Sequence, residues 1–211
     1  MSWKLLRHLD ALTELLLATR NENKISEIKN CLGELSLRIL TFKEMRDFPV
    51  IIEDGKSLYE NALKKAKNIA TFFNKLTLAD DSGLEVDFLL GKPGVFSSRF
   101  AGISATYEDN NKKLLKLLLA VTRNRRKAQF KCVMVISSPD RIIGRFEGLL
   151  KGEILEKGRG EGGFGYDPVF YVDKYGKTLA ELTLSEKNEI SHRGIALRKV
   201  QEFLKENNSV Y

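Results

Sequence analysis

A strictly alternating apolar segment in the second half of the chain constrains the fold more than any other feature. Every second side chain is apolar over the series Ala128, Phe130, Cys132, Met134 and Ile136. This spacing predicts a long strand with one buried face. The turn-forming sequence Ser137–Asp140 follows, and a second extended segment runs from Arg141 to Leu155. Two strands joined by so short a turn predict an antiparallel hairpin.

Shorter apolar patterns flank this hairpin on both sides. Apolar runs bounded by polar residues predict buried strands at Leu15–Ala18, Leu37–Thr41, Thr77–Ala79 and Val169–Val172. Apolar side chains at helical spacing predict helices over Lys24–Leu35, Ser57–Phe73, Thr106 to about Ala120, and Ser191 to about Asn207. Helices that alternate with strands around a hairpin predict an α/β fold with a mixed sheet. We expect one two-lobed domain over residues 15–211, with an ordered loop at 91–105.

Composition excludes several classes of protein. The chain has 211 residues, of which 43% are hydrophobic and 30% charged, as in ordinary folded domains. No apolar run approaches the roughly 20 residues that span a bilayer, so we expect no membrane association. Two cysteines, Cys31 and Cys132, without metal-site spacing predict a reducing, cytoplasmic compartment. Residues 1–14 lack the long apolar core of a signal peptide and form a leader of unknown role.

An excess of basic residues leaves a second class of protein open. Lys and Arg number 35 against 28 acids, which gives a net charge of +7 and attracts polyanions of any kind. A nucleic-acid-binding protein would gather its basic residues with stacking aromatics on one face. Here the cationic residues are spread along the chain, and we expect no nucleic-acid partner. Tight, salt-sensitive DNA binding without triphosphate turnover would favour that alternative.

The first candidate functional segment joins a predicted strand to a predicted helix. It consists of Thr19, Arg20, Asn21, Glu22, Asn23 and Lys24. A helix N-terminus presents free N–H groups and a positive dipole end, which together hold phosphate, and Lys24 adds a full charge. The pattern of a P-loop is absent. The residues alone also permit a turn that only links strand to helix.

Two consecutive acids end the strand predicted at Thr77–Ala79. Buried carboxylates are costly without cationic or hydrogen-bonding partners. Magnesium is commonly held by one or two carboxylates together with water and phosphate oxygens. Neighbours on an extended strand point to opposite faces, so Asp80 and Asp81 have different partners. One would face a ligand and the other would fix the loop; a simple acidic turn is the alternative.

A glycine-rich loop and a later polar segment offer the parts of a nucleobase pocket. Glycines let backbone approach a flat ligand, and aromatic rings stack on bases. Lys187, His192 and Arg193 add hydrogen-bond donors. The loop residues of interest are Phe164, Gly165, Tyr166 and Asp167. A tight corner of the chain is the alternative interpretation.

Five segments match one family pattern in order and in spacing. They are TRNENK at 19–24, ADDSGLEVD at 79–87, GKPGVFSSRFAG at 91–102, GEGGFGYDPVF at 160–170 and KNEISHRGIAL at 187–197. Together they resemble the Ham1/inosine triphosphate pyrophosphatase family, from about Leu15 to Leu204. The departures are Arg20, where the family often has a small residue, and Phe88, where alanine is common. Residues 1–14 have no counterpart in compact members.

This resemblance implies both a fold and an activity. The fold would be elongated, with a long central sheet and a cleft between two lobes, in a homodimer. The activity would be Mg²⁺-dependent hydrolysis of the non-standard purine nucleoside triphosphates ITP, dITP and XTP to monophosphate and pyrophosphate, which clears them from the nucleotide pool. A pyrophosphatase for modified pyrimidine triphosphates shares this chemistry and stays an alternative.

The resemblance also assigns roles residue by residue. Asp81 would be the general base and a magnesium ligand, Glu53 a second metal-site acid, and Ser82 a substrate contact. The turn Thr19–Lys24 would bind the triphosphate, with Lys24 as a catalytic cation. The base pocket would comprise Phe164, Gly165, Tyr166, Asp167, Lys187, His192 and Arg193.

Hydrogen-bond chemistry predicts the base preference. Hypoxanthine and xanthine present a 6-oxo acceptor, whereas adenine presents a 6-amino donor. Donors from Lys187, His192 or Arg193 would donate to the 6-oxo group and would clash with the 6-amino group. Sites built on such bonds reject mispaired analogues strongly. Guanine also carries a 6-oxo group, so this argument does not explain its rejection.

Overall fold

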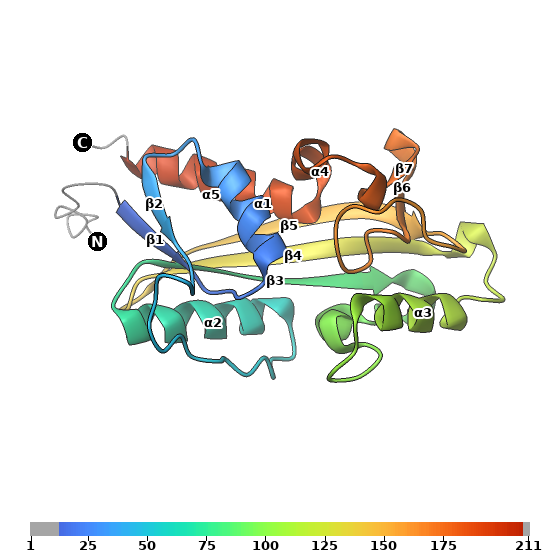
Figure 1. Cartoon of the computed structure of the whole chain (residues 1–211), viewed down its shortest axis with the longest axis horizontal. Helices are drawn as coiled ribbons and strands as arrows, with labels where there is room; N and C mark the ends of the chain where they lie inside the picture. Colours follow the sequence, from blue (N-terminus) through green and yellow to red (C-terminus); the bar gives the residue numbers. More distant parts are fainter. Residues whose placement is uncertain (1–12, 209–211) are drawn as a thin grey trace.

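The strands form one mixed sheet in the computed structural model, which describes residues 13–208. Within this range the sheet has seven strands in the order β2-β1-β3-β4-β5-β6-β7. β1 runs parallel to β2 and β3, and the other neighbours are antiparallel. The strands are β1 Thr13–Leu17, β2 Leu37–Leu40, β3 Thr77–Val86, β4 Lys127–Ser137, β5 Ile142–Ile154, β6 Phe170–Val172 and β7 Lys177–Thr178. The elongated α/β fold with a mixed central sheet is confirmed (Figure 1).

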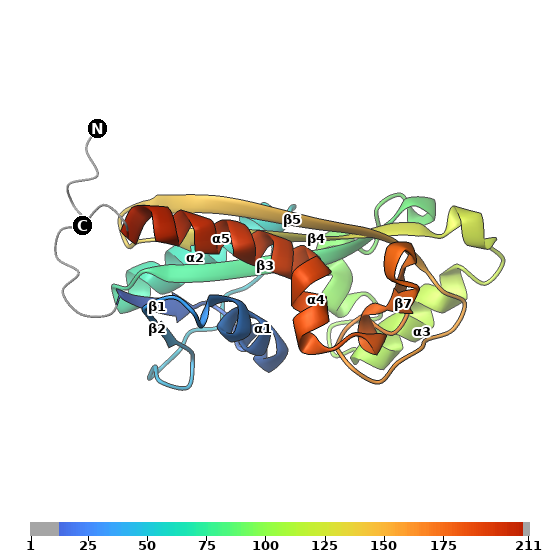
Figure 2. The ribbon, with the colours of Figure 1, turned by 90° about the horizontal axis from the view of Figure 1, so that it is seen from above.

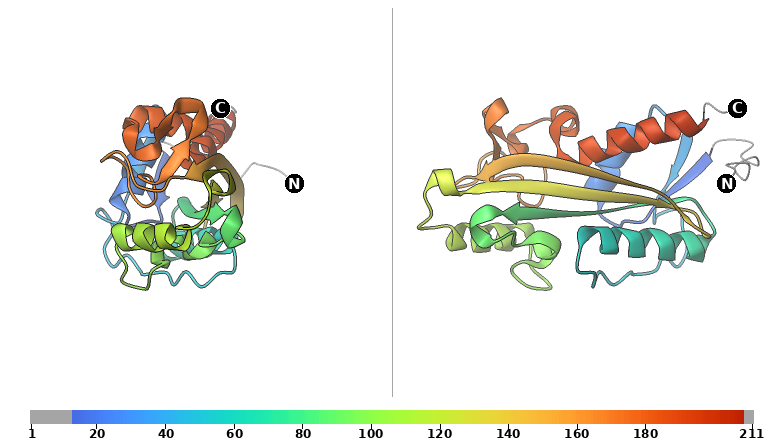
Figure 3. Two further views of the ribbon diagram at one scale, coloured as in Figure 1. Left: turned by 90° about the vertical axis from the view of Figure 1, so that its right-hand side faces the viewer. Right: turned by 180° about the vertical axis from the view of Figure 1, so that it is seen from behind.

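Helices cover both faces of this sheet (Figure 1). On one face lie α1 (Glu22–Leu32), α4 (Leu184–Ile190) and α5 (His192–Asn208). On the other, α2 (Leu58–Phe73) and α3 (Tyr107–Leu117) follow one another along the long axis, as the view from behind shows (Figure 3). Seen from above, α5 lies along part of the length of β4 and β5 (Figure 2). No helix within residues 13–208 is long and apolar enough to cross a membrane.

The predicted hairpin is present, but the second half of its first strand is buried on both faces. β4 pairs with β5 from Lys127 opposite Glu153 to Ser137 opposite Ile142. Cys132 and Met134 pack in the core with α5, as the alternation predicts. The residues between them differ from the prediction, because Val133 and Val135 are also buried, against α2. The half-buried interpretation therefore holds from Lys127 to Lys131 and was wrong from Cys132 onward, where the strand lies between two helical layers.

β3 is longer than predicted, and its length creates the opening in which the site lies. The predicted strand ended at Asp80–Asp81, but β3 continues to Val86 and pairs with β4 throughout. β1 pairs with β3 only as far as Leu78. Among residues 13–208, no strand covers this edge of β3 beyond Leu78. The opening therefore lies between the turn after β1 and the segments that follow β3.

Part of the uncovered edge is satisfied by the segment predicted as an ordered loop. Residues 94–99 form a short 3₁₀ helix whose Ser97 hydroxyl accepts a hydrogen bond from the Leu84 amide at 2.9 Å. The Tyr166 hydroxyl donates to the Ser97 carbonyl at 2.8 Å. These bonds join β3, this segment and the glycine-rich loop into one wall. Other 3₁₀ helices lie at Asp87–Leu89, Arg123–Arg125, Asp173–Tyr175 and Leu179–Glu181.

Polar capping residues begin two of the predicted helices. Ser57 caps α2 by accepting a hydrogen bond from the Glu60 amide, and Thr106 and Asp109 form a complete capping box at α3. A similar box of Thr183 and Glu186 begins α4, which was not predicted. Of the predicted leader, residues 1–12 lie outside the described range, and β1 begins at Thr13. The domain boundary at residue 15 stays a prediction.

Close contact between α5 and the sheet generates a prediction about stability. A Cβ at Gly148 of β5 would lie 1.9 Å from the carbonyl oxygen of His192. We expect Gly148→Ala to lower the free energy of unfolding by about 1–3 kcal/mol, the usual cost of overpacking. Gly158→Ala is the control, because its nearest atom would be 3.4 Å away. Urea denaturation measures both, and equal stability of the two variants would contradict this packing.

Candidate active site

A cavity of about 350 Å³ lies at the uncovered edge of β3. Its walls come from the turn after β1, from β3, and from the segments around Phe164 and His192. Every predicted site residue lines this cavity except Glu22 and Asn23. The Glu22 carboxylate instead pairs with Lys43 at 2.8 Å on the surface. The structure therefore brings together the predicted turn, the predicted acids, the glycine-rich loop and the polar segment around His192 at one cavity.

The turn after β1 is held rigid by its own side chains. Asn21 is the N-cap of α1, and its Oδ1 accepts hydrogen bonds from the amides of Asn23 at 3.0 Å and Lys24 at 3.2 Å. The Asn21 amide in turn donates to Thr19 Oγ1 at 3.1 Å. Arg20 donates to the carbonyl of Phe48 and lies over its ring. The turn is thus an ordered helix start of the kind that binds anions.

Asp80 is neutralised on one face of β3. Its Oδ2 lies 2.9 Å from Lys24 Nζ and 3.3 Å from Arg193 Nη2. The Ser82 hydroxyl donates to the same oxygen at 3.2 Å. Although burial disfavours its charge, Lys24 and Arg193 hold the pKa of Asp80 well below its usual range. Asp80 therefore stays ionised and joins β3 to α1 and α5.

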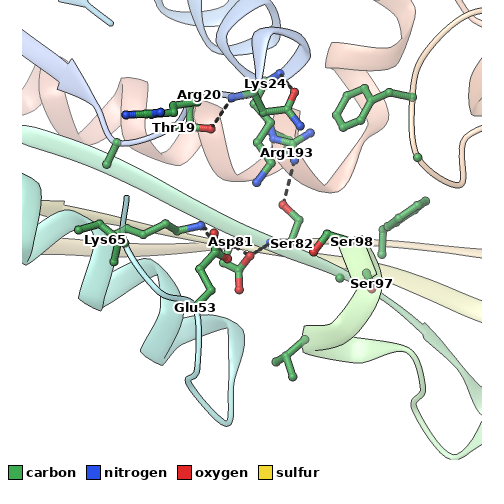
Figure 4. A pocket seen from close by; sticks show the side chains of 18 of the residues that line it. Thr19, Arg20, Lys24, Glu53, Lys65, Asp81, Ser82, Ser97, Ser98 and Arg193 are labelled. Carbon is green, nitrogen blue, oxygen red and sulfur yellow. Dashed lines mark hydrogen bonds and ion pairs between the residues drawn. The ribbon is translucent and has the colours of Figure 1, made fainter. Parts of the chain in front are cut away.

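Asp81 lies on the opposite face, toward α2 (Figure 4). Its Oδ2 accepts a hydrogen bond from Asn61 at 3.0 Å, and Lys65 Nζ lies 3.8 Å from Oδ1. Lys65 also pairs with Glu53 Oε2 at 3.2 Å. Burial raises the pKa of Asp81 above its ordinary value despite Lys65 and Lys24, and the Glu53 charge adds to the rise. A carboxyl in a cleft with a raised pKa has the properties of a general base.

A chain of alternating charges joins the two ends of the cavity. Lys187 Nζ lies 2.6 Å from Asp167 Oδ2 and 2.7 Å from Glu27 Oε1. The second Glu27 oxygen accepts from Arg193 Nη1 at 2.5 Å, and Arg193 continues to Asp80. Burial works against the charge of Glu27, but Arg193 and Lys187 hold its pKa below the ordinary value. Each buried charge in this chain has a partner of opposite sign, as burial requires.

Aromatic rings line the far end of the cavity. The imidazole of His192 stacks on Phe130 with ring centroids 4.6 Å apart. Burial and the neighbouring Arg193 and Lys187 hold the pKa of His192 well below its ordinary value, so the ring is neutral at pH 7. The Phe164 ring has Lys187 Nζ 4.5 Å from its centroid. This end combines an aromatic ring next to a cation with a neutral imidazole, which together suit a flat aromatic ligand.

Two predicted donors are already engaged. The argument from sequence treated Lys187 and Arg193 as available to a base, but each binds two carboxylates. Lys187 uses two of its three N–H groups. Arg193 uses four of its five, two for Asp80 and one each for Glu27 and Ser82, so one remains on each side chain. His192 Nδ1 is buried and finds no hydrogen-bond partner among the described residues. His192 is therefore the least engaged polar group at this end.

The arrangement at Asp81 fits a divalent cation. No group of three or more His, Cys, Asp and Glu suited to a metal occurs among residues 13–208. Glu53 and Asp81 supply two carboxylates that share one cationic neighbour, the Lys65 ammonium. Two carboxylates with water and phosphate oxygens are a usual set for Mg²⁺. The residues present therefore fit the ion that the resemblance implies.

Several polar residues at this site were missed by sequence reasoning, among them Tyr107, Asn110 and three that contact the charged groups. Asn61 and Lys65 lie on the buried face of α2, and Glu27 is buried on α1. A usable signal was present for two of them. Asn61 and Lys65 share the helical face of Leu58, Ala62 and Ile69, and polar residues on an apolar stripe indicate a buried polar site.

The sequence matches known proteins along most of its length. The sequence model of the Ham1 family matches residues 15–203. A dITP/XTP pyrophosphatase of Desulforamulus reducens is 48% identical over 191 residues, covering 90% of this chain and 95% of that protein. A dITP/XTP pyrophosphatase of Geobacter sulfurreducens is 48% identical over 193 residues, covering 92% and 97%.

Solved structures agree with the sequence matches. A HAM1 protein of Coxiella burnetii has a TM-score of 0.85 and 39% identity, covering 92% of this chain and 100% of that one. The Ham1 protein of Staphylococcus aureus has a TM-score of 0.82 and 40% identity, covering 92% and 98%. The predicted resemblance is confirmed by these similarities and by the family match. By sequence and by fold, this chain belongs to the Ham1 family.

Proposed function

We propose that this chain hydrolyses the non-standard purine nucleoside triphosphates ITP, dITP and XTP to the monophosphate and pyrophosphate. The observation that carries the proposal is that Lys24 and Asp81, from different elements, line one cavity beside an ordered helix start. A polyphosphate needs such cationic and N–H groups along its length. The relatives named dITP/XTP pyrophosphatase support the substrate class.

The cavity suggests how a nucleotide is oriented. Its triphosphate would lie at the end that contains Lys24, Glu53 and Asp81, with the base between Phe164 and the His192 region. Lys24 retains its charge, because the Asp80 carboxylate raises its pKa against the effect of burial. Neutral His192 would offer one donor and one acceptor to the edge of the base. The remaining N–H groups of Lys187 and Arg193 would favour a 6-oxo purine.

Asp81 would carry the chemical step. It accepts the proton of a water whose oxygen attacks the α-phosphorus, while the bond from that phosphorus to the β-bridging oxygen breaks. The products are the nucleoside monophosphate and pyrophosphate. Lys24 and the N–H groups of the turn stabilise the negative charge that gathers on the leaving group. Asn61 and the Ser82 amide, which both donate to Asp81, fix the direction of its carboxylate.

Mg²⁺ belongs to this proposal as the cofactor. Glu53 and Asp81 would hold it, and it would neutralise phosphate charge and polarise the phosphorus when bound. Lys65, which lies beside both carboxylates, balances their charge and keeps them on one side of the cavity. The Arg99 guanidinium donates to the Glu53 carbonyl at 2.8 Å and so holds this acid near β3.

The proposal extends to assembly and location. We propose that the protein works as a homodimer in the cytoplasm. A groove lined by Leu90, Phe96 and Phe100 supports self-association, because Leu90 and Phe96 are exposed apolar side chains. Cys31 and Cys132, both free thiols, support a reducing compartment.

Removal of the proposed base gives a direct prediction. We expect Asp81→Asn to lower kcat for ITP by at least about 10², the usual contribution of a general base, while folding is retained. Asp87→Asn, at an exposed residue that directly follows β3, is the control and should leave kcat unchanged. Steady-state kinetics with pyrophosphate detection and circular dichroism measure the two effects. Near-normal turnover in Asp81→Asn would remove this residue from the mechanism.

The pH dependence of the wild type checks the same role. A base acts only when ionised, so kcat/KM should fall as pH drops through the pKa of Asp81. Because burial raises that pKa, the fall should begin above the ordinary value of about 3.9. The acid limb should be missing from the residual activity of Asp81→Asn. An unchanged limb in the variant would assign it to another group.

A substrate panel tests the base preference. We expect ITP, dITP and XTP to exceed ATP in kcat/KM by about 10² or more, because adenine presents a donor to donors. Pyrophosphate release is measured for each triphosphate, with modified pyrimidine triphosphates included. Comparable rates for ATP and ITP would contradict the donor argument. A preference for modified pyrimidines would assign the alternative enzyme class.

A further inference from the structure

Tyr107 contributes to the cavity from α3, which lies on the other side of the sheet from α1 (Figure 1). It is the first residue of α3, directly after the N-cap Thr106. Tyr107 lines the cavity together with Asn21 and Phe164, and 43% of its surface is exposed. It belongs to none of the segments that carry the family pattern. The proposed mechanism gives Tyr107 no role.

Two contacts fix the ring between the two ends of the site. Asn21 Nδ2 donates to the Tyr107 hydroxyl at 3.3 Å, which joins α3 to the phosphate-binding turn. The Tyr107 and Phe164 rings lie with centroids 6.0 Å apart, a usual separation for an aromatic pair. Asn21 is itself held as the cap of α1. Tyr107 thus connects the turn to the glycine-rich loop across the opening.

The base of α3 is anchored well enough to hold this ring in place. The capping box of Thr106 and Asp109 fixes the first turn of the helix. Asn110 is buried and bonds the Ala101 amide at 2.7 Å, and Asn111 donates to the Gly165 carbonyl at 2.9 Å. The helix is therefore attached to both neighbouring segments, and Tyr107 is a positioned side chain rather than a loose surface ring.

We infer that Tyr107 is a positioning residue that encloses the sugar of the bound nucleotide. The inference rests on the proposed function, which places the triphosphate near Lys24 and the base near Phe164. A ring that touches Asn21 at one end and Phe164 at the other covers the space between them, and that space belongs to the sugar. Because Asn21 donates to the hydroxyl, the phenolic proton is left to donate to a sugar or phosphate oxygen.

Two variants separate the hydroxyl from the ring. Tyr107→Phe keeps the ring beside Phe164 but removes the hydroxyl, with its bond from Asn21 and its proposed bond to the nucleotide. KM for ITP should then rise about three- to tenfold with kcat within twofold. Tyr107→Ala removes the enclosure as well and should raise KM further, by more than tenfold. A rise in KM at unchanged kcat marks lost binding rather than lost chemistry.

Binding without turnover supplies a second readout. Calorimetry of ITP with Asp81→Asn, alone and combined with each Tyr107 variant, should show the same rise in Kd as in KM. Tyr175→Phe is the matched control, because Tyr175 is also 43% exposed but lies outside the cavity lining. It should leave KM and Kd unchanged.

The outcomes distinguish this inference from the function on which it rests. If the wild type hydrolyses ITP and both Tyr107 variants keep its KM and Kd within twofold, the positioning role is wrong while the function stands. A lower unfolding temperature with unchanged KM would assign Tyr107 a structural role only and would also overturn the inference. If the wild type hydrolyses no triphosphate in the panel, the proposed function itself fails.

Discussion

Two consecutive aspartates on an extended strand are the constraint on which the rest of the site depends. An extended backbone sends Asp80 and Asp81 to opposite faces of β3, and each face must then satisfy a buried carboxylate. On one face, Lys24 and Arg193 neutralise Asp80 and draw the starts of α1 and α5 together. On the other, Asn61 and Lys65 only partly compensate Asp81. The resulting asymmetry makes one acid structural and leaves the other available for chemistry.

The same strand also sets the extent of the cavity. β3 continues beyond the end of β1, so its uncovered edge runs from the aspartates toward Ser97 and the glycine-rich loop. The ion pairs of Glu27 with Lys187 and Arg193 join the part of the cavity near Asp167 to the part near Asp80. Each of these buried charges has a partner, and removal of one partner would be costly. The family resemblance and the physical layout lead to the same orientation of substrate.

Much of the fold followed from local pattern, whereas the partners inside the site did not. Alternation and helical spacing found the hairpin and the main helices, because burial of one face imposes a period on the sequence. The length of β3 was missed because its acids interrupt the apolar pattern, and α4 because a short polar helix carries little period. Pairings such as Glu27 with Lys187 join residues far apart in sequence, and no local pattern encodes them. The roles of the site residues were predicted from the family resemblance, because spacing alone left a structural alternative open for each candidate segment.

The central claim is that one triphosphate contacts both Lys24 and Asp81 across the opening at β3. The most direct measurement is a crystal structure of the Asp81→Asn variant with ITP and Mg²⁺. The account predicts phosphate oxygens within hydrogen-bond distance of Lys24 Nζ and a metal ion between the phosphates and Glu53. A nucleotide seated elsewhere, or with its phosphates out of reach of Lys24, would contradict it.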